Sequence, residues 1–224
     1  MSEQAKPSRD PANDGSMVGM LQQVFDKLLQ KIDDMLPAVV MSYDRDSNMA
    51  TVHPLVSVVT TEGEPVSRAQ LTSVPAMQFG GGGFVLNFPL KAGDLGWIKA
   101  NDRDISLYLQ SFGESMPNTK RKHSFEDGVF IPNVLRDFII NAEDKENAVL
   151  QSLDGSVRIS LFPDKIKLTA ATVEVDGNFK VTGTSELAGQ VTATAGATIA
   201  GIEFRTHKHT GVDTGTGTSG GPTS

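Results

Sequence analysis

The residues best suited to metal chemistry are two histidines close together near the end of the sequence. His207 and His209 stand two positions apart in a short polar run. Residues i and i+2 of an extended strand point to the same side, so both imidazoles can face one direction. One such pair is a weak site. Three chains around a common axis would instead present six imidazole nitrogens.

Six neutral imidazoles in a closed octahedral cage suit a first-row divalent ion such as Fe²⁺ better than tetrahedral Zn²⁺. With no open coordination position, such an ion would be structural rather than catalytic. Because imidazole binds metal only when neutral, we expect metal retention to fail as the pH falls below roughly 6.5. The Gly/Thr/Ser-rich tail from residue 211 to 224 is either disordered or folded back over the metal as a cap.

Composition excludes several other classes of protein. The chain has 224 residues, a net charge of -7 and no cysteine, so disulfides and thiolate metal sites are excluded. An acidic chain lacks the basic face that duplex binding needs, and the short basic run at 120–123 is interpreted as a solvated linker. We therefore expect no nucleic-acid partner. No apolar stretch approaches the roughly 20 residues that span a bilayer.

Residues 1–16 are polar and are interpreted as a disordered lead without the features of a signal peptide, which predicts synthesis in a cytoplasm without export by the general secretory route. Residues 17–36 form one amphipathic helical pattern, with Ser16 as N-cap and Pro37 as the stop. Leu21 and Leu28 stand seven apart with Val24 between them. Two interpretations stay open: a helix packed on its own domain, or a seam between identical chains.

From residue 37 to 112 the apolar period becomes two, which predicts a small closed barrel of the OB type. The expected strands are 38–43, 50–60, 67–77, 83–88, 95–99 and 105–110. Residues 113–134, rich in Gly, Pro and charge, are expected to be a linker.

Residues 135–204 alternate in short apolar bursts separated by small turns, with too few inward side chains for a monomeric sandwich. A narrow ladder of short strands cannot bury its apolar face alone, so neighbouring chains must cover it. The prediction is an intertwined trimeric β-helix, followed by a metal-binding apex at 205–224. The small residues of 182–201 fit either a narrowing fibre or a flexible linker.

The other constellations carry no catalytic prediction. The run Gly80–Gly83 lacks the Lys-Ser/Thr of a phosphate loop and is expected to be an inter-strand loop or a close chain contact. Asp102 and Asp104 are interpreted as solvated turn residues, His53 as a satisfied barrel residue and His123 as part of the linker. No nucleophile elbow or convincing acid pair is present, so no catalytic or organic-cofactor residue is assigned.

The chain resembles the central spike proteins of contractile-tailed phages, the short membrane-piercing type of Mu-like phages and their relatives. The resemblance covers roughly residues 37–224. It rests on four segments of the sequence: Gly93-Asp94-Leu95-Gly96-Trp97, Leu107-Tyr108, the run from Lys122 to Pro132, and His207-Lys208-His209 with its tail.

The resemblance implies a mainly β fold: an OB barrel that docks on the tail hub or baseplate, a trimeric β-helix, and an apex iron held by His207 and His209 of three chains. It also implies a virion location and a structural, non-enzymatic role in piercing the host outer membrane during sheath contraction. Some members hold calcium and chloride, whose ligands we do not assign in this sequence. The helix at 17–36 lies outside the pattern, and hub or baseplate docking is our hypothesis for it.

Two rival functions remain. The first is a β-helical tailspike that depolymerises surface glycan, which needs two suitably spaced carboxylates. The acids of the ladder, namely Asp154, Asp164, Glu174, Asp176 and Glu186, mostly lie near turns. The second is a trimeric fibre tip that binds a receptor, which would expose aromatic anchors near the tip, where the sequence offers Phe204.

Overall fold

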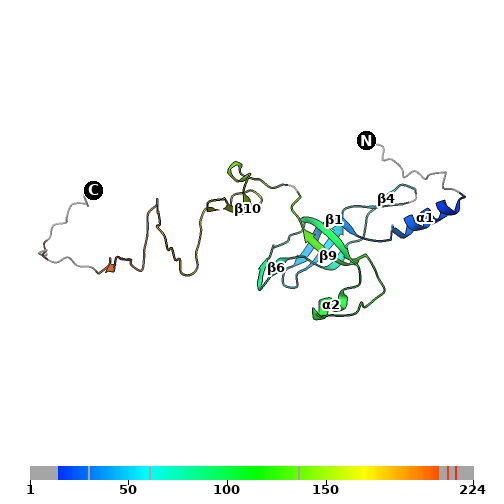
Figure 1. Ribbon diagram of the computed structural model, residues 1–224, viewed down its shortest axis with the longest axis horizontal. Helices are drawn as coiled ribbons and strands as arrows, with labels where there is room; N and C mark the ends of the chain where they lie inside the picture. Colours follow the sequence, from blue (N-terminus) through cyan, green and yellow to red (C-terminus); the bar gives the residue numbers. More distant parts are fainter. Residues whose placement is uncertain are drawn as a thin grey trace. The chain divides into compact units, whose positions relative to one another are not determined.

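The computed structural model describes residues 15–29, 31–60, 62–135, 137–206, 211 and 215. The chain divides into two compact units, Met1–Ala171 and Thr172–Ser224, and each is considered by itself. The first unit holds the helix α1, a β-barrel and a small three-stranded sheet (Figure 1). No helix among the described residues is long and apolar enough to cross a membrane.

The helix α1 spans Met17–Leu29 and begins as the sequence predicts. The Ser16 hydroxyl accepts the Gly19 N–H at 2.9 Å, which confirms Ser16 as the N-cap. The predicted end at residue 36 is wrong, because Met35 and Leu36 pair with Lys99 and Ile98 across a sheet. Leu36 precedes a proline, which disfavours a helical backbone at that position.

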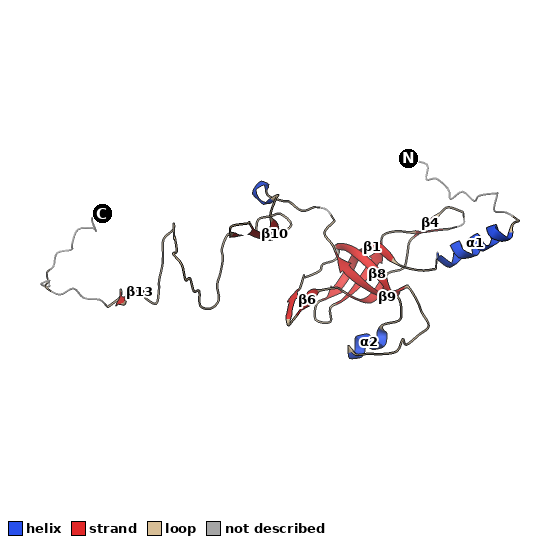
Figure 2. Cartoon of the chain, in the orientation of Figure 1, coloured by secondary structure: helices blue, strands red, loops and turns tan. Residues whose placement is uncertain are grey.

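Five antiparallel strands in the order β5-β2-β1-β8-β9 form one sheet that curls into a nearly closed, OB-like barrel (Figure 2). Its strands are β1 (Met35–Asp44), β2 (Met49–Pro54), β5 (Leu71–Pro75), β8 (Leu95–Asn101) and β9 (Ser124–Pro132). An isolated bridge between Ala76 and Phe130 joins the two edge strands, and the Met77 N–H donates to the Phe130 carbonyl at 2.7 Å. Closure of this kind leaves few free strand edges.

The barrel core is built from alternate residues of these strands. Phe130, Ile98 and Val52 are fully buried at its centre, with 0% of each exposed. Phe130 lies directly against the backbone of Gly96, where an added Cβ would be 2.4 Å from the ring atom Cζ. Only glycine fits this position, so the packing of the core requires glycine at position 96, directly before Trp97.

Two predictions for this region are wrong. The predicted strand 105–110 is the short helix α2 (Ser106–Ser111), and the predicted linker 113–134 contains β9, the fifth barrel strand. The strand β9 was missed because a bulge opposite Lys99 and Asn101 breaks its period of two. As a result Phe125 and Phe130, five positions apart, are both buried.

The remaining strands are short. Beside the barrel, β3 (Val58–Val59) pairs with β4 (Pro65–Val66), and β6 (Phe79–Gly81) pairs with β7 (Phe84–Leu86). Farther along, β10 (Ala148–Gln151), β11 (Arg158–Leu161) and β12 (Ile166–Thr169) form an antiparallel sheet preceded by the 3-10 turn η2 (Ala142–Asp144). In the second unit, β13 (Thr198–Ile199) pairs with β14 (Ile202–Glu203).

We predict that Gly96→Ala lowers the stability of the barrel by about 1–3 kcal/mol, because the new methyl group overpacks the core against Phe130. Thermal unfolding of the full chain, followed by the fluorescence of its single tryptophan, Trp97, measures the effect. Gly81→Ala is the matched control, since nothing lies within 4 Å of a Cβ added there. Equal midpoints for the two variants would contradict this account of the core.

Candidate interchain surface and apex

The sheet β10-β11-β12, hereafter the shaft sheet, has two faces of opposite character. One face carries the rows Val149–Ser160–Lys167 and Gln151–Arg158–Thr169, and the other carries Ala148–Leu161–Ile166 and Leu150–Ile159–Leu168. Side chains alternate between the faces because successive residues of a strand point to opposite sides. The first face is therefore mostly polar, and the second is entirely apolar.

The polar face is the buried one. The turn η2 folds over it, and Arg158 Nε donates to Asp144 Oδ2 at 2.8 Å. Arg158 also pairs with Glu143, whose carboxylate accepts Lys167 Nζ at 2.7 Å. Asp144 and Ser160 are 1% and 0% exposed. Removing one partner of such a buried ion pair costs about 3–5 kcal/mol, because the other charge is left uncompensated.

The apolar face is open. Its larger side chains are between 41% and 69% exposed, and they are Leu150, Ile159, Leu161, Ile166 and Leu168. A sheet normally buries its apolar face and leaves its polar face in water. The shaft sheet does the reverse within one chain, so its apolar side is available for a partner.

The segment that follows continues this exposure. Between residues 172 and 197 the described chain contains no strand. Its larger apolar side chains are 45% to 78% exposed, and they are Val173, Val175, Phe179, Val181, Leu187 and Val191. A chain of this composition gains little by ordering alone, because it buries none of these groups.

Within the described residues of the second unit, a short β-hairpin precedes the histidine pair in the sequence. The β13–β14 hairpin turns at Ala200 and Gly201, whose φ angles are 50° and 81°, as a tight two-residue hairpin turn requires. Glu203 fastens it: Oε2 accepts the Thr198 hydroxyl at 3.0 Å, and Oε1 accepts the Arg205 N–H at 3.1 Å. The structure describes the chain continuously from this hairpin to Thr206.

The predicted ligands His207 and His209 lie outside the described residues, so their geometry stays a prediction. The other two histidines are placed in or beside the barrel. His53 lies in β2, with Nε2 3.3 Å from the Ser67 hydroxyl, and His123 Nε2 lies 3.1 Å from Asp102. Within the described residues no group of three His, Cys, Asp or Glu side chains could hold a metal ion.

Two families match the chain. Residues 36–133 match the phage protein Gp138 N-terminal domain, and residues 201–223 match the GpV Apex motif. The two matches cover the barrel and the region from the β13–β14 turn through the histidine pair. The chain is a phage baseplate central spike protein. A comparison with curated proteins found no match.

The spike protein is a structural component of the phage tail baseplate, and its family is a structural one. Membership in this family implies assembly into a baseplate. The geometry described above for the shaft sheet lies between the two matched segments.

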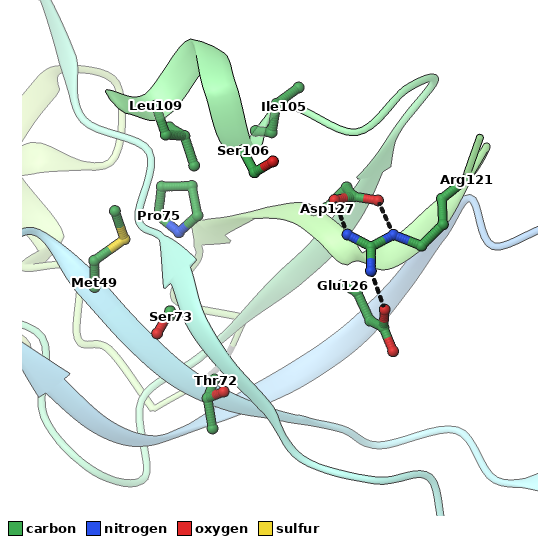
Figure 3. A pocket seen from close by; sticks show the side chains of 11 residues that line it. Met49, Thr72, Ser73, Pro75, Ile105, Ser106, Leu109, Arg121, Glu126 and Asp127 are labelled. Carbon is green, nitrogen blue, oxygen red and sulfur yellow. Dashed lines mark hydrogen bonds and ion pairs between the residues drawn. The ribbon is translucent and has the colours of Figure 1, made fainter. Parts of the chain in front are cut away.

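A cavity of about 270 Å³ opens between α2 and the barrel (Figure 3). On one wall Ile105, Leu109 and Pro75 present apolar side chains. On the other, Arg121 forms a fork with Asp127 at 2.9 and 2.8 Å and donates to Glu126 at 2.8 Å. The hydrogen bonds to Asp127 raise the pKa of the Arg121 guanidinium. The contacts fasten the chain before β9 to β9 itself.

This network corrects two predictions. The basic run at 120–123 is not purely a solvated linker, because Arg121 is ion-paired to a buried carboxylate. Asp104, predicted to be solvated, is 4% exposed, and its Oδ1 accepts the Ser106 N–H at the start of α2. Gly82 and Gly83, with φ of 60° and 87°, form the turn between β6 and β7, which confirms a loop between strands there.

We predict that the ion pairs over the polar face of the shaft sheet weaken at low pH, because Glu143 becomes protonated. Hydrogen bonds from Lys167 and then Arg158 lower the pKa of this carboxyl below its usual 4.5. A depressed pKa means that the carboxylate stabilises the fold above 4.5 and that this contribution is lost as the pH falls through the lower, folded value. The protection factors of the amides of residues 158–161, which compare the observed with the intrinsic exchange rate at each pH, should therefore fall on acidification.

Glu143→Gln should raise the exchange rate of the same amides already at neutral pH and remove the additional acid sensitivity. Glu146→Gln, at an exposed position next to the same turn, is the matched control and should leave exchange unchanged. Identical exchange in wild type and Glu143→Gln at neutral pH would show that the cover of the polar face by η2 does not depend on this carboxylate.

Proposed function

We propose that the spike protein acts as a homotrimer that pierces the host outer membrane, driven point-first by contraction of the tail sheath. Three chains wind about one axis from residue 135 to 204 as a β-helix. The observation that carries the proposal is the inverted burial of the shaft sheet. Its polar face is closed by Arg158, Asp144 and Glu143, while its apolar face stays open.

Threefold association accounts for this inversion physically. Each chain turns five large aliphatic side chains of the shaft sheet to one side, and three such faces around an axis cover one another. Full burial of a Leu or Ile side chain is worth about 1.5–3 kcal/mol. The second unit, considered by itself, also exposes its larger apolar side chains between residues 173 and 191. A shaft held in this way resists unwinding, as a puncturing device requires.

At the apex, His207 and His209 of the three chains would hold one Fe²⁺ ion. The support is the GpV Apex motif over residues 201–223, together with the spacing of two between His207 and His209, which would put both imidazoles on one side of an extended strand. The ion would clamp three chain ends that otherwise fray. Calcium and chloride along the axis stay a possibility without assigned ligands in this chain.

In the assembled tail, the barrel and the region before it would dock on the hub or baseplate. We propose no enzymatic activity. Of the ladder acids, Asp154 accepts hydrogen bonds from Ser152 and Ser156 within its own turn. These bonds, led by that of Ser152, lower the pKa of Asp154 to about 2, so it is ionised near neutral pH and cannot act as a general acid. A glycan-release assay with host envelope should accordingly show no product.

The first test is the solution mass of the purified chain. We predict a mass three times the 23.9 kDa of one chain for the wild type. The double variant Ile166→Asp, Leu168→Asp should be monomeric, because it places charges in the apolar interface. Lys165→Asp, at the exposed turn beside β12, is the control and should stay trimeric. A stable wild-type monomer in dilute neutral buffer would refute the proposal.

The second test is metal content. We predict one iron per three chains by elemental analysis of the wild type and none in the double variant His207→Ala, His209→Ala. Protease mapping should show that the variant is cut faster near its apex, while the barrel is cut at the wild-type rate. The single variant His53→Ala, in the barrel, controls for the loss of an imidazole. Unchanged metal in the double variant would refute the ligand assignment but not the trimer.

A further inference from the structure

The helix α1 carries an apolar stripe with no cover from the described part of its own chain. The stripe consists of Met17, Leu21, Val24 and Leu28, which are between 49% and 79% exposed. Their spacing of four, three and four is the a/d repeat of a coiled-coil seam. Met20 and Phe25 flank it with exposures of 67% and 62%, which makes the apolar surface wide.

The helix cannot depend on its intrinsic stability. It has 13 residues, and isolated helices shorter than about 12–15 residues are marginal in water. Packing of the stripe must therefore stabilise it. Packing on its own domain, one of the two interpretations of the sequence, is contradicted by the exposure of every residue in the stripe.

The polar side of α1 argues against a lipid surface as the partner. It carries Gln22, Gln23, Asp26 and Lys27, one acid against one base. Helices that lie on anionic membranes use a polar face rich in Lys and Arg. A neutral polar side opposite an a/d stripe is instead typical of a helix that packs against other helices.

The chain after α1 is anchored to the barrel within a few residues. Asp33 pairs with Arg68 at 3.1 Å, accepts the Phe125 N–H at 3.2 Å, and donates its own N–H to the His123 carbonyl at 2.9 Å. The Ala100 N–H donates to the Asp34 carbonyl at 2.8 Å. Each helix of an assembly is therefore tethered at a fixed point of its barrel, four positions beyond Leu29.

We infer that the α1 helices of three copies pack together as a parallel three-helix bundle on the axis of the spike. The inference rests on the proposed trimer, which places three identical tethers around one axis. Short tethers raise the effective concentration of the helices for one another without any new contact. The threefold axis makes the helices parallel, and the width of the apolar surface, with Met20 and Phe25 beside the stripe, suits three strands better than two.

Crosslinking tests the bundle directly, because the chain has no cysteine of its own. Val24→Cys places a thiol in the stripe, and Asp26→Cys places one on the opposite side of the same helix turn. With a short bis-maleimide we expect Val24→Cys to give covalent dimers in most of the assemblies. Asp26→Cys should give at least fivefold less.

Hydrogen exchange of residues 20–28 is the second readout. Leu21→Asp, Leu28→Asp should lose the protection of α1 while the solution mass stays trimeric through the shaft. Gln22→Asp, Gln23→Asp adds the same two charges on the polar side and should keep the protection.

The outcomes separate the bundle from the trimer. A trimeric wild type whose Val24→Cys variant crosslinks no better than Asp26→Cys overturns the bundle and leaves the proposed function standing. Protection of α1 that appears only after a baseplate protein is added also overturns it, since the stripe would then dock on that protein. A monomeric wild type overturns the proposed function itself.

Discussion

The ion pair between Arg158 and Asp144 decides which side of the shaft sheet is available to other chains. Both side chains are nearly inaccessible to water, where a charged group needs a partner of opposite charge, and Arg158 Nε donates to Asp144 Oδ2 at 2.8 Å. With η2 on the polar face, the described residues of the first unit leave the aliphatic face of the sheet exposed. In the proposed trimer, association removes Ile159, Leu161 and Leu168 from water.

The barrel, by contrast, buries its apolar side chains within one chain. Its sheet curls until Ala76 meets Phe130, so the inward residues of β1, β2 and β8 cover one another. The first unit of the spike protein therefore contains two kinds of β-structure, one complete alone and one incomplete. This division suits the proposed assembly, in which the barrel docks on the baseplate and the shaft sheets of three chains pack together. In such a trimer the barrel can fold before the chains associate, and the shaft sheet becomes ordered on association.

How much of this the sequence could predict depended on whether local pattern and tertiary pairing agreed. The start of α1 was predictable because Ser16 caps it through a local hydrogen bond. The end of α1 could not be predicted in the same way, because Met35 and Leu36 pair with β8, which lies more than 60 positions later in the sequence. Ile105, Leu107 and Leu109 stand at every second position, a spacing that is typical of a strand, although the segment forms the helix α2. The carboxylate of Asp104, which accepts the Ser106 N–H at the start of α2, was the available signal for a helix, and Asp104 was interpreted as solvated. For the shaft, the sequence predicted chains that need partners. It did not predict the ion pair of Arg158 with Asp144, because these residues lie 14 positions apart, in β11 and in η2.

The hairpin at Ala200 and Gly201 lies where the predicted ladder of strands ends and the predicted apex begins. In a ladder of strands around an axis each chain must continue along that axis, whereas metal ligation requires the chain to turn and direct side chains toward the axis. A tight reversal, fixed by Glu203 to Thr198 and to the backbone of Arg205, halts the advance within a few residues. The GpV Apex motif begins at residue 201, on this turn. The length of chain from the turn to His207 is short, so the position of the hairpin restricts where the imidazoles can reach. In the proposed trimer, this restriction would hold the imidazoles of the three chains close to one another.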